Sequence, residues 1–202
     1  MVNSIDIYTD ENNTEKNYRY SLGKSGSKTL FILAMNPSVA TQEKWDQTII
    51  KSFGLSAILG YDSCIIFNLI PYRERKSDQL PISFDDDFNE NIFKNNVRAI
   101  FAAIKTCPQD SIDILACWGG LVYSNELLRN SLLRIYRGLR FSHKQINWYC
   151  LKDTKSGNIL TEEGHPRHLS FLQETTVPVL FDIDNYIRHI TLQGFIPNEA
   201  EV

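Results

Sequence analysis

The hydrophobic and polar positions of this chain divide it into strand-sized apolar runs and amphipathic segments. Four runs are apolar almost without interruption and end in turn residues, which is typical of strands buried on both faces of a parallel sheet. They cover residues 29–35, 63–70, 112–117 and 146–151. Two segments, at 4–8 and 17–22, alternate apolar and polar residues and predict an antiparallel hairpin at a sheet edge.

Between and after these runs, apolar residues recur at helical spacing. The predicted helices cover residues 47–59, 87–105, 121–136, 169–174 and 182–191. Asp46 is placed to cap the first of them, and Gly60 to end it in the left-handed conformation. Strands that alternate with helices imply right-handed crossovers. We therefore expect an α/β fold with three layers, α/β/α, in which a mainly parallel central sheet of about four strands carries the N-terminal hairpin at its edge.

The composition indicates a single α/β domain over residues 1–202, ending in a flexible acidic tail at 194–202. The chain is 43% hydrophobic and 22% charged, which is ordinary for a globular protein. It has no run long enough to span a membrane and no secretory signal, so we expect a cytoplasmic protein with no membrane partner. Four scattered cysteines indicate reduced core residues in place of disulfides or a zinc site. They are Cys64, Cys107, Cys117 and Cys150.

Polar residues follow each of the four long apolar runs. In an open α/β sheet the carboxyl ends of parallel strands share one edge, and ligands bind there. The residues expected to meet at that edge are Asn36, Ser38, Asn68, Tyr72, Arg73, Trp118, Gly119, Gly120, His165, Arg167 and His168, with Asp46 above them. Amides recognise hydrogen-bonding edges, aromatic rings stack, and arginines bind phosphate. This set predicts a site for a planar polar ligand.

Each of these residues also has a structural explanation. Asn36 and Asn68 can cap turns, and Trp118 can belong to the core. His165 and His168 can be loop residues, and without further ligands their spacing is not a metal motif, so no metal is expected. The glycine patterns of dinucleotide-binding folds and of phosphate-binding P-loops are absent, so no cofactor is expected.

A series of short motifs, in the same order, resembles the bacterial family known as domain of unknown function 1643. The motifs are Asn36-Pro37-Ser38, Asp46-Gln47-Thr48, Gly60-Tyr61, Asn68 to Arg73, Trp118-Gly119 and Gly164 to His168. The resemblance covers residues 17–175. It departs from the family pattern at Leu169, where the family has a proline. The family has no established activity to transfer.

The layout is also similar to that of the uracil-DNA glycosylase superfamily, which has a parallel four-stranded sheet in three layers. In those enzymes the first strand end positions a water, and a histidine in the last loop stabilises the departing base. The resemblance implies that Asn36 positions water and that His168 or His165 stabilises the anionic base. Asp46 would replace the superfamily's catalytic aspartate, which is missing beside the first motif.

The same resemblance implies roles for the remaining residues of the set. Arg167 and Arg73 would contact phosphate, while Asn68, Tyr72 and Trp118 would recognise and stack an extruded base. Leu169 or Phe171 would be the apolar wedge that enters DNA beside the histidine loop.

The expected function is nucleobase or nucleotide binding, with N-glycosidic cleavage of nucleic acid as the expected reaction. Two alternatives stay open: a non-catalytic sensor of a nucleotide or modified base, and a hydrolase of free nucleosides or nucleotides. The net charge of −3 fits the last alternative better than binding to duplex DNA, because phosphate contacts dominate DNA affinity.

Overall fold

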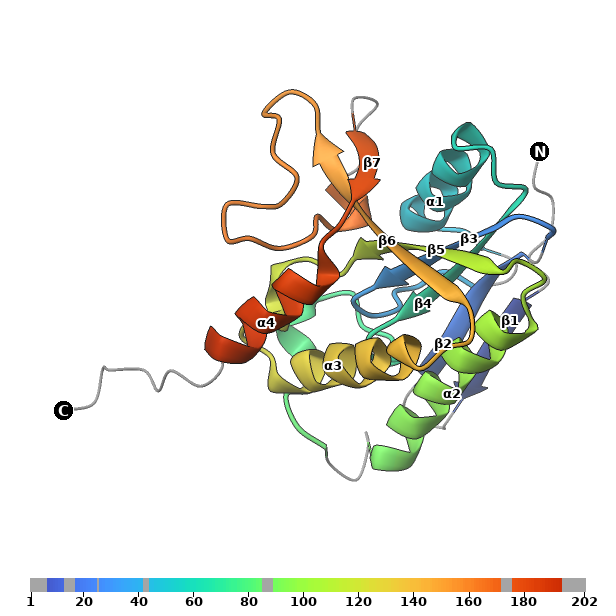
Figure 1. Cartoon of the computed structure of the whole chain (residues 1–202). Helices are drawn as coiled ribbons and strands as arrows, with labels where there is room; N and C mark the ends of the chain where they lie inside the picture. Colours follow the sequence, from blue (N-terminus) through green and yellow to red (C-terminus); the bar gives the residue numbers. More distant parts are fainter. Residues whose placement is uncertain are drawn as a thin grey trace.

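The computed structural model describes residues 7–12, 17–24, 26–41, 44–84, 89–171 and 176–193 (Figure 1). Within these residues the chain forms a seven-stranded mixed sheet with the order β1-β2-β4-β3-β5-β6-β7. The strands are β1 (Ile7–Asn12), β2 (Asn17–Lys24), β3 (Thr29–Ala34), β4 (Ser63–Asn68), β5 (Ser111–Cys117), β6 (Gln145–Asp153) and β7 (Thr176–Leu180). Strands β4, β3, β5 and β6 run parallel, whereas β1, β2 and β7 are joined to their neighbours antiparallel.

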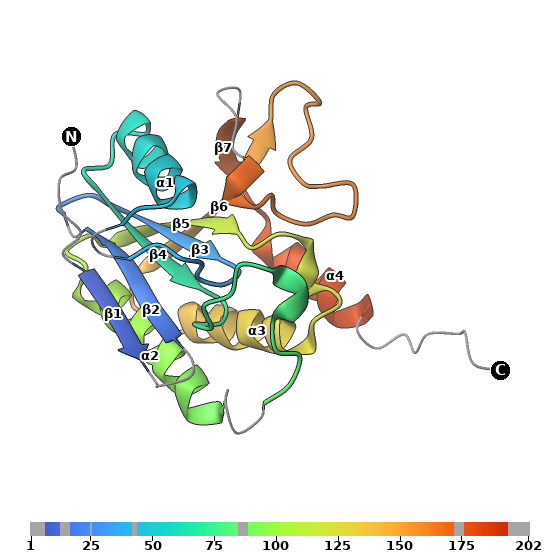
Figure 2. The same ribbon diagram turned by 180° about the vertical axis from the view of Figure 1, so that it is seen from behind.

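Helices lie on both faces of this sheet (Figures 1 and 2). They are α1 (Gln47–Ile58), α2 (Glu90–Thr106), α3 (Glu126–Arg140) and α4 (Ile183–Gln193). Three short 3₁₀ turns accompany them, η1 (Ser77–Gln79), η2 (Gly120–Val122) and η3 (Leu169–Phe171). α1 packs on one face, and α2, α3 and α4 pack on the other. The predicted ends of α1 are confirmed, since Asp46 accepts a hydrogen bond from the Ile49 amide at 3.0 Å and Gly60 has a φ of 76°.

The core explains why the long apolar runs contain no alternation. Along β3, Phe31 and Leu33 pack on the side of α2 and α3, while Leu30 and Ile32 pack on the side of α1 with Ile49. Every residue of β3 is buried. A strand covered on both faces needs apolar residues at successive positions, which is the pattern that the sequence shows.

The α/β class is confirmed, but the sheet is mixed where a mainly parallel one was predicted. Residues 176–180 form an edge strand that was not predicted, because Pro178 argues against a strand except at an edge. The helix predicted at 169–174 is a single 3₁₀ turn over Leu169–Phe171. The predicted helix at 121–136 is instead η2 followed by α3, which begins at Glu126.

Several predictions fall outside the described residues: the start of the hairpin at 4–6, the end of the helix at 172–174, and the tail at 194–202. Cys64, Cys117 and Cys150, which were predicted to lie in buried strands, are buried, and Cys107 is buried as well; all four are free thiols. In the part of the chain that the structure describes, every helix is too short or too polar to cross a lipid bilayer.

Candidate functional site

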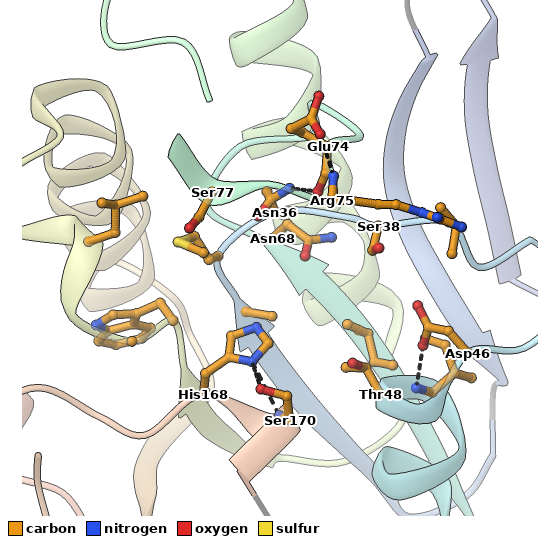
Figure 3. A pocket seen from close by; sticks show the side chains of 18 of the residues that line it. Asn36, Ser38, Asp46, Thr48, Asn68, Glu74, Arg75, Ser77, His168 and Ser170 are labelled. Carbon is orange, nitrogen blue, oxygen red and sulfur yellow. Dashed lines mark hydrogen bonds between the residues drawn. The ribbon is translucent and has the colours of Figure 1, made fainter. Parts of the chain in front are cut away.

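A cavity of about 670 Å³ lies at the carboxyl ends of β3, β4 and β5, beside the N-terminus of α1 (Figure 3). Its polar lining comes from Arg19, Asn36, Ser38, Asp46, Gln47, Thr48, Asn68, Glu74, Arg75, Ser77, His168 and Ser170. Its remaining lining comes from Ala34, Met35, Val39, Ile49, Ile66, Trp118, Gly119, Gly120 and Leu121. The predicted edge of the sheet is therefore where the structure has a cavity.

Parallel pairing brings Asn36 and Asn68 together from distant parts of the sequence. Ala34 lies opposite Asn68 in the register of β3 and β4. The Leu69 amide donates to the Ala34 carbonyl at 2.9 Å, which continues the pairing past the end of β4. Pro37 has no amide hydrogen, so β3 stops there and the Asn36 side chain borders the cavity.

The Asn36 amide serves both the loop and the cavity. Its Nδ2 donates to the Glu74 carbonyl at 2.8 Å and to the Pro37 carbonyl at 3.0 Å. The Glu74 amide returns a hydrogen bond to the Pro37 carbonyl at 3.0 Å. These bonds hold the loop after β4 against the end of β3. Within the described residues no hydrogen bond engages Asn36 Oδ1, so this acceptor is available to a ligand or a water.

Asn68 lines the cavity and has a buried hydrogen-bond donor without a partner among the described residues. The residue is 1% exposed, yet its Nδ2 is buried without a hydrogen-bond partner among the described residues. Figure 3 shows the amide facing the space between His168 and Asp46. A buried donor without a partner costs about 1–3 kcal/mol of stability. The Asn68 Nδ2 therefore lies at the cavity wall without a hydrogen bond to the described part of the fold.

His168 presents a neutral ring to the same space. Ser170 contacts Nδ1 through its hydroxyl at 2.8 Å and donates its backbone amide to Nδ1 at 3.2 Å. An N–H donor at Nδ1 makes that nitrogen an acceptor, so the proton of the neutral ring sits on Nε2. Burial lowers the pKa of His168 below its ordinary value of 6.5, and the Asp46 carboxylate opposes that shift. In Figure 3 the Nε2 edge points away from Ser170 and toward Asn36 and Asn68.

Asp46 lies across the cavity from His168 (Figure 3). Its Oδ1 accepts from the Ile49 amide and caps α1. No hydrogen bond within the described residues engages its Oδ2. The carboxylate therefore combines a structural cap with a negative charge and a free acceptor at the cavity.

His165, the predicted alternative to His168, is outside the lining of the cavity. It is 4% exposed, and its Nδ1 lies 3.0 Å from the Tyr186 hydroxyl oxygen. The Trp118 indole donates to the same hydroxyl at 3.1 Å. The Tyr186 hydroxyl thus joins the Trp118 indole to the His165 ring. The His165 ring therefore contacts Tyr186 on α4. Of the two histidines, only His168 borders the cavity.

The predicted stacking residues do not offer free rings. Trp118 borders the cavity but is fully buried, with Trp148, Phe181 and Tyr186 around its indole. Tyr72 is outside the lining and packs edge-on against Tyr18, with ring centroids 5.9 Å apart. The structure therefore places Trp118 at the cavity with its indole buried, and it places Tyr72 outside the lining.

The predicted phosphate ligands separate in the structure. Arg167 is outside the lining, and its Nη2 donates to the Leu160 carbonyl at 3.0 Å, which holds the loop after β6. Arg73 donates to the Ala40 carbonyl at 3.0 Å and lines a neighbouring cavity. Of the two, Arg73 alone borders space that a ligand can reach.

Gly119 joins β5 to the histidine loop. Its φ of 74° is a conformation that residues with a Cβ rarely adopt. Its amide donates to the Pro166 carbonyl at 3.1 Å, and a Cβ placed on it would lie 3.7 Å from the His168 Cβ. The positive φ therefore allows the end of β5 to hold the loop that carries His168.

Sequence reasoning missed several lining residues. Arg19 is 3% exposed and reaches the cavity from β2, where its Nη1 donates to the Ala40 carbonyl at 2.8 Å. No local pattern marks it, because its position depends on how β2 pairs with β4. Thr48 could have been found, since it belongs to the Asp46-Gln47-Thr48 motif. Arg75 stands beside Arg73 in a basic cluster of the sequence.

The family model described as "Protein of unknown function (DUF1643)" matches residues 19–168, which is more than half of the chain. The chain belongs to this family. The DUF1643 match contains every predicted site residue and ends before β7 and α4. No curated protein and no solved structure matches this DUF1643 chain, so the likeness to uracil-DNA glycosylases gains no support from the comparisons.

Proposed function

We propose that this DUF1643 protein binds a nucleobase in the cavity and hydrolyses the N-glycosidic bond that joins the base to its sugar. The observation that carries the proposal is the unpartnered Asn68 amide, which faces the same space as the neutral His168 ring. An amide offers one donor and one acceptor edge, and nucleobases present complementary edges. The volume of about 670 Å³ is in the range of small-molecule sites.

The side chains suit a reaction in which the base leaves as an anion. A water bound to Asn36 Oδ1 and the Asp46 carboxylate attacks the anomeric carbon while the carbon–nitrogen bond breaks. The water proton passes to Asp46, and the bonding electron pair leaves with the base. The Nε2–H of His168 donates to the developing anion, which then regains a proton through solvent. A preorganised donor of this kind contributes about 10²–10³ in rate.

The proposal includes a uracil-DNA-glycosylase-like arrangement of the fold and a cytoplasmic location. The parallel strands that end in Asn36-Pro37 and Trp118-Gly119, followed by the histidine loop, support the first. The four free, buried cysteines support a reducing compartment.

The test is to incubate the full chain with nucleosides, nucleotides and oligonucleotides that carry normal and deaminated bases, and to measure released base by chromatography. We expect release by the wild type and a loss of about 10²-fold or more in Asn36→Ala and His168→Ala. His143→Ala is the matched control, since His143 lies on the loop after α3 outside the lining.

Binding of nucleobases by calorimetry without any release would overturn the catalytic part and leave a sensor. Absence of both binding and release would overturn the proposal as a whole.

A further inference from the structure

A second cavity of about 250 Å³ adjoins the first. It is lined by Ser38, Val39, Arg73, Glu74 and Arg75, and all of these except Arg73 also line the first cavity. Figure 3 shows Ser38 and Arg75 on the side of the first cavity that lies away from His168. A ligand whose base contacts Asn68 and His168 can therefore extend past Ser38 into the second space.

The wall that the two cavities share carries two donors without a hydrogen bond among the described residues, Arg75 and Ser38. Within the described residues, no hydrogen bond or ion pair engages the Arg75 guanidinium, and none engages the Ser38 hydroxyl. Arg73 is half-buried and anchored through Nη2 to the Ala40 carbonyl at 3.0 Å, so its charge is held at the second cavity. Guanidinium groups and hydroxyls are the donors that proteins use for phosphate.

Glu74 is the opposing charge in this wall, and its carboxylate is occupied by the backbone. Its Oε1 accepts from the Arg75 amide at 2.7 Å and from the Lys76 amide at 3.0 Å. Both bonds shape the loop that places Arg75 beside the cavity. Arginines stand on either side of Glu74 in the sequence, and both line the second cavity.

We propose that the natural ligand is a free nucleoside monophosphate, whose phosphate occupies the second cavity against Arg73, Arg75 and Ser38. This inference rests on the proposed function, because it takes the base to lie against Asn68 and His168. It adds an anionic subsite and the class of substrate.

Two observations favour a free nucleotide over a base in DNA. Leu169, one of the two residues expected as a wedge beside the histidine loop, is fully buried and packs in the core with α1, so it cannot enter a duplex. The side chain of the other, Phe171, lies outside what the structure describes. The net charge of −3 opposes binding of a long polyanion but has little effect on a single phosphate held by two arginines.

The experiment is calorimetric titration of the full chain with nucleosides and with the matching 5′-monophosphates. For any base that binds, we expect the monophosphate to bind about tenfold or more tightly than the nucleoside. In Arg75→Ala this difference should largely disappear. Arg98→Ala is the control, because Arg98 is an exposed arginine on α2 outside both cavities.

Each other outcome contradicts a different statement. Equal affinity for nucleosides and monophosphates overturns the anionic subsite and leaves the proposed function standing. A single-stranded or duplex oligonucleotide that binds more tightly than every monophosphate overturns the free-nucleotide class. Failure of nucleobases, nucleosides and monophosphates alike to bind overturns the proposed function itself.

Discussion

Two buried asparagines, Asn68 and Asn96, use the same side chain in opposite ways. Asn96 on α2 is fully buried, and its Nδ2 donates to the carbonyls of Asn68 and Leu69 at 2.9 and 3.1 Å. It thereby fixes the end of β4 from below. The Asn68 Nδ2 has no such partner. At the residue scale, the Asn96 Nδ2 stabilises the fold although its Oδ1 is buried without a partner among the described residues, whereas the Asn68 Nδ2 makes no hydrogen bond to them.

Replacing each amide by leucine should therefore change the free energy of unfolding in opposite directions. Asn68→Leu removes a buried, unpartnered donor, so stability should stay equal or rise by up to about 1 kcal/mol, with nucleobase binding lost. Asn96→Leu should lose about 1–3 kcal/mol, because the Asn68 carbonyl loses this donor, whereas the Leu69 carbonyl keeps the Ser131 hydroxyl. Urea unfolding of the two variants measures both. A clear loss of stability in Asn68→Leu would show that its amide does hold the fold.

Residue identities at the strand ends could be predicted, but side-chain directions could not. Asn36 and Asn68 follow apolar runs, so their place at the cavity follows from the pattern. His165 and His168 sit three positions apart in one loop, and which of them faces the cavity depends on Tyr186. That contact joins residues 21 positions apart through tertiary packing, which no local pattern reveals.

At the scale of elements, the start of α1 combines a cap with a charge. Asp46 accepts from the Ile49 amide and also raises the pKa of His168 against the effect of burial. The residue that caps α1 therefore also changes the pKa of the His168 imidazole through its carboxylate.

Asp46→Asn should separate the two roles. The amide oxygen keeps the cap, so stability should change by only a few tenths of a kcal/mol. The pKa of His168 should fall further, because the charge that raised it is gone. Asp46→Ala should lose about 1 kcal/mol as well as the charge. NMR titration of His168 and urea unfolding test both effects, and an unchanged His168 pKa in Asp46→Asn would rule out the electrostatic link.

Helix α4 is tied to the site region through one hydroxyl. Tyr186 accepts from Trp118 and bonds to His165, and Gly120 lies so close to His165 that an added Cβ would be 3.2 Å from its Cδ2. Burial raises the pKa of the Tyr186 phenol, so it stays an O–H donor.

Tyr186→Phe should lose about 1–3 kcal/mol, because Trp118 Nε1 and His165 Nδ1 are left buried without this partner. Tyr123→Phe is the matched control, since Tyr123 is exposed and the described residues place no hydrogen bond on its hydroxyl. Thermal or urea unfolding compares the pair. Equal stability of the two variants would contradict the network.

The ends of an element could be predicted from the sequence where the capping residues act on neighbouring residues. Asp46 and Gly60 mark α1 because both act within a few residues of the helix ends. β7 was not predicted because a proline such as Pro178 argues against a strand. Pro178 is tolerated because β7 is an edge strand that, within the described residues, pairs only with β6. The edge of a sheet is a property of the assembled fold.

For the molecule as a whole, the buried histidines set a pH dependence. Burial lowers the pKa of both His165 and His168 in the fold. The unfolded chain therefore binds protons at a higher pH than the folded one. Stability from these groups is present above about pH 6.5 and is lost as the pH falls through their folded pKa values.

The free energy of unfolding should accordingly decrease from pH 7.5 to pH 5, before the carboxylates titrate. Urea unfolding across this range measures the slope, which should be smaller in His165→Gln. A flat profile in the wild type would show that neither histidine is held neutral by the fold.

The family match ends at His168, and η3, β7 and α4 follow it in the part of the chain that the structure describes. Phe181 and Tyr186 cover the Trp118 indole, and Ile187 and Ile190 of α4 belong to the same core. An expression fragment cut at the family boundary would open that core to water. Expression of related chains should therefore extend through the equivalent of Gln193. A shorter fragment lacks part of the core, so its failure to bind or react would not show that the intact domain is inactive.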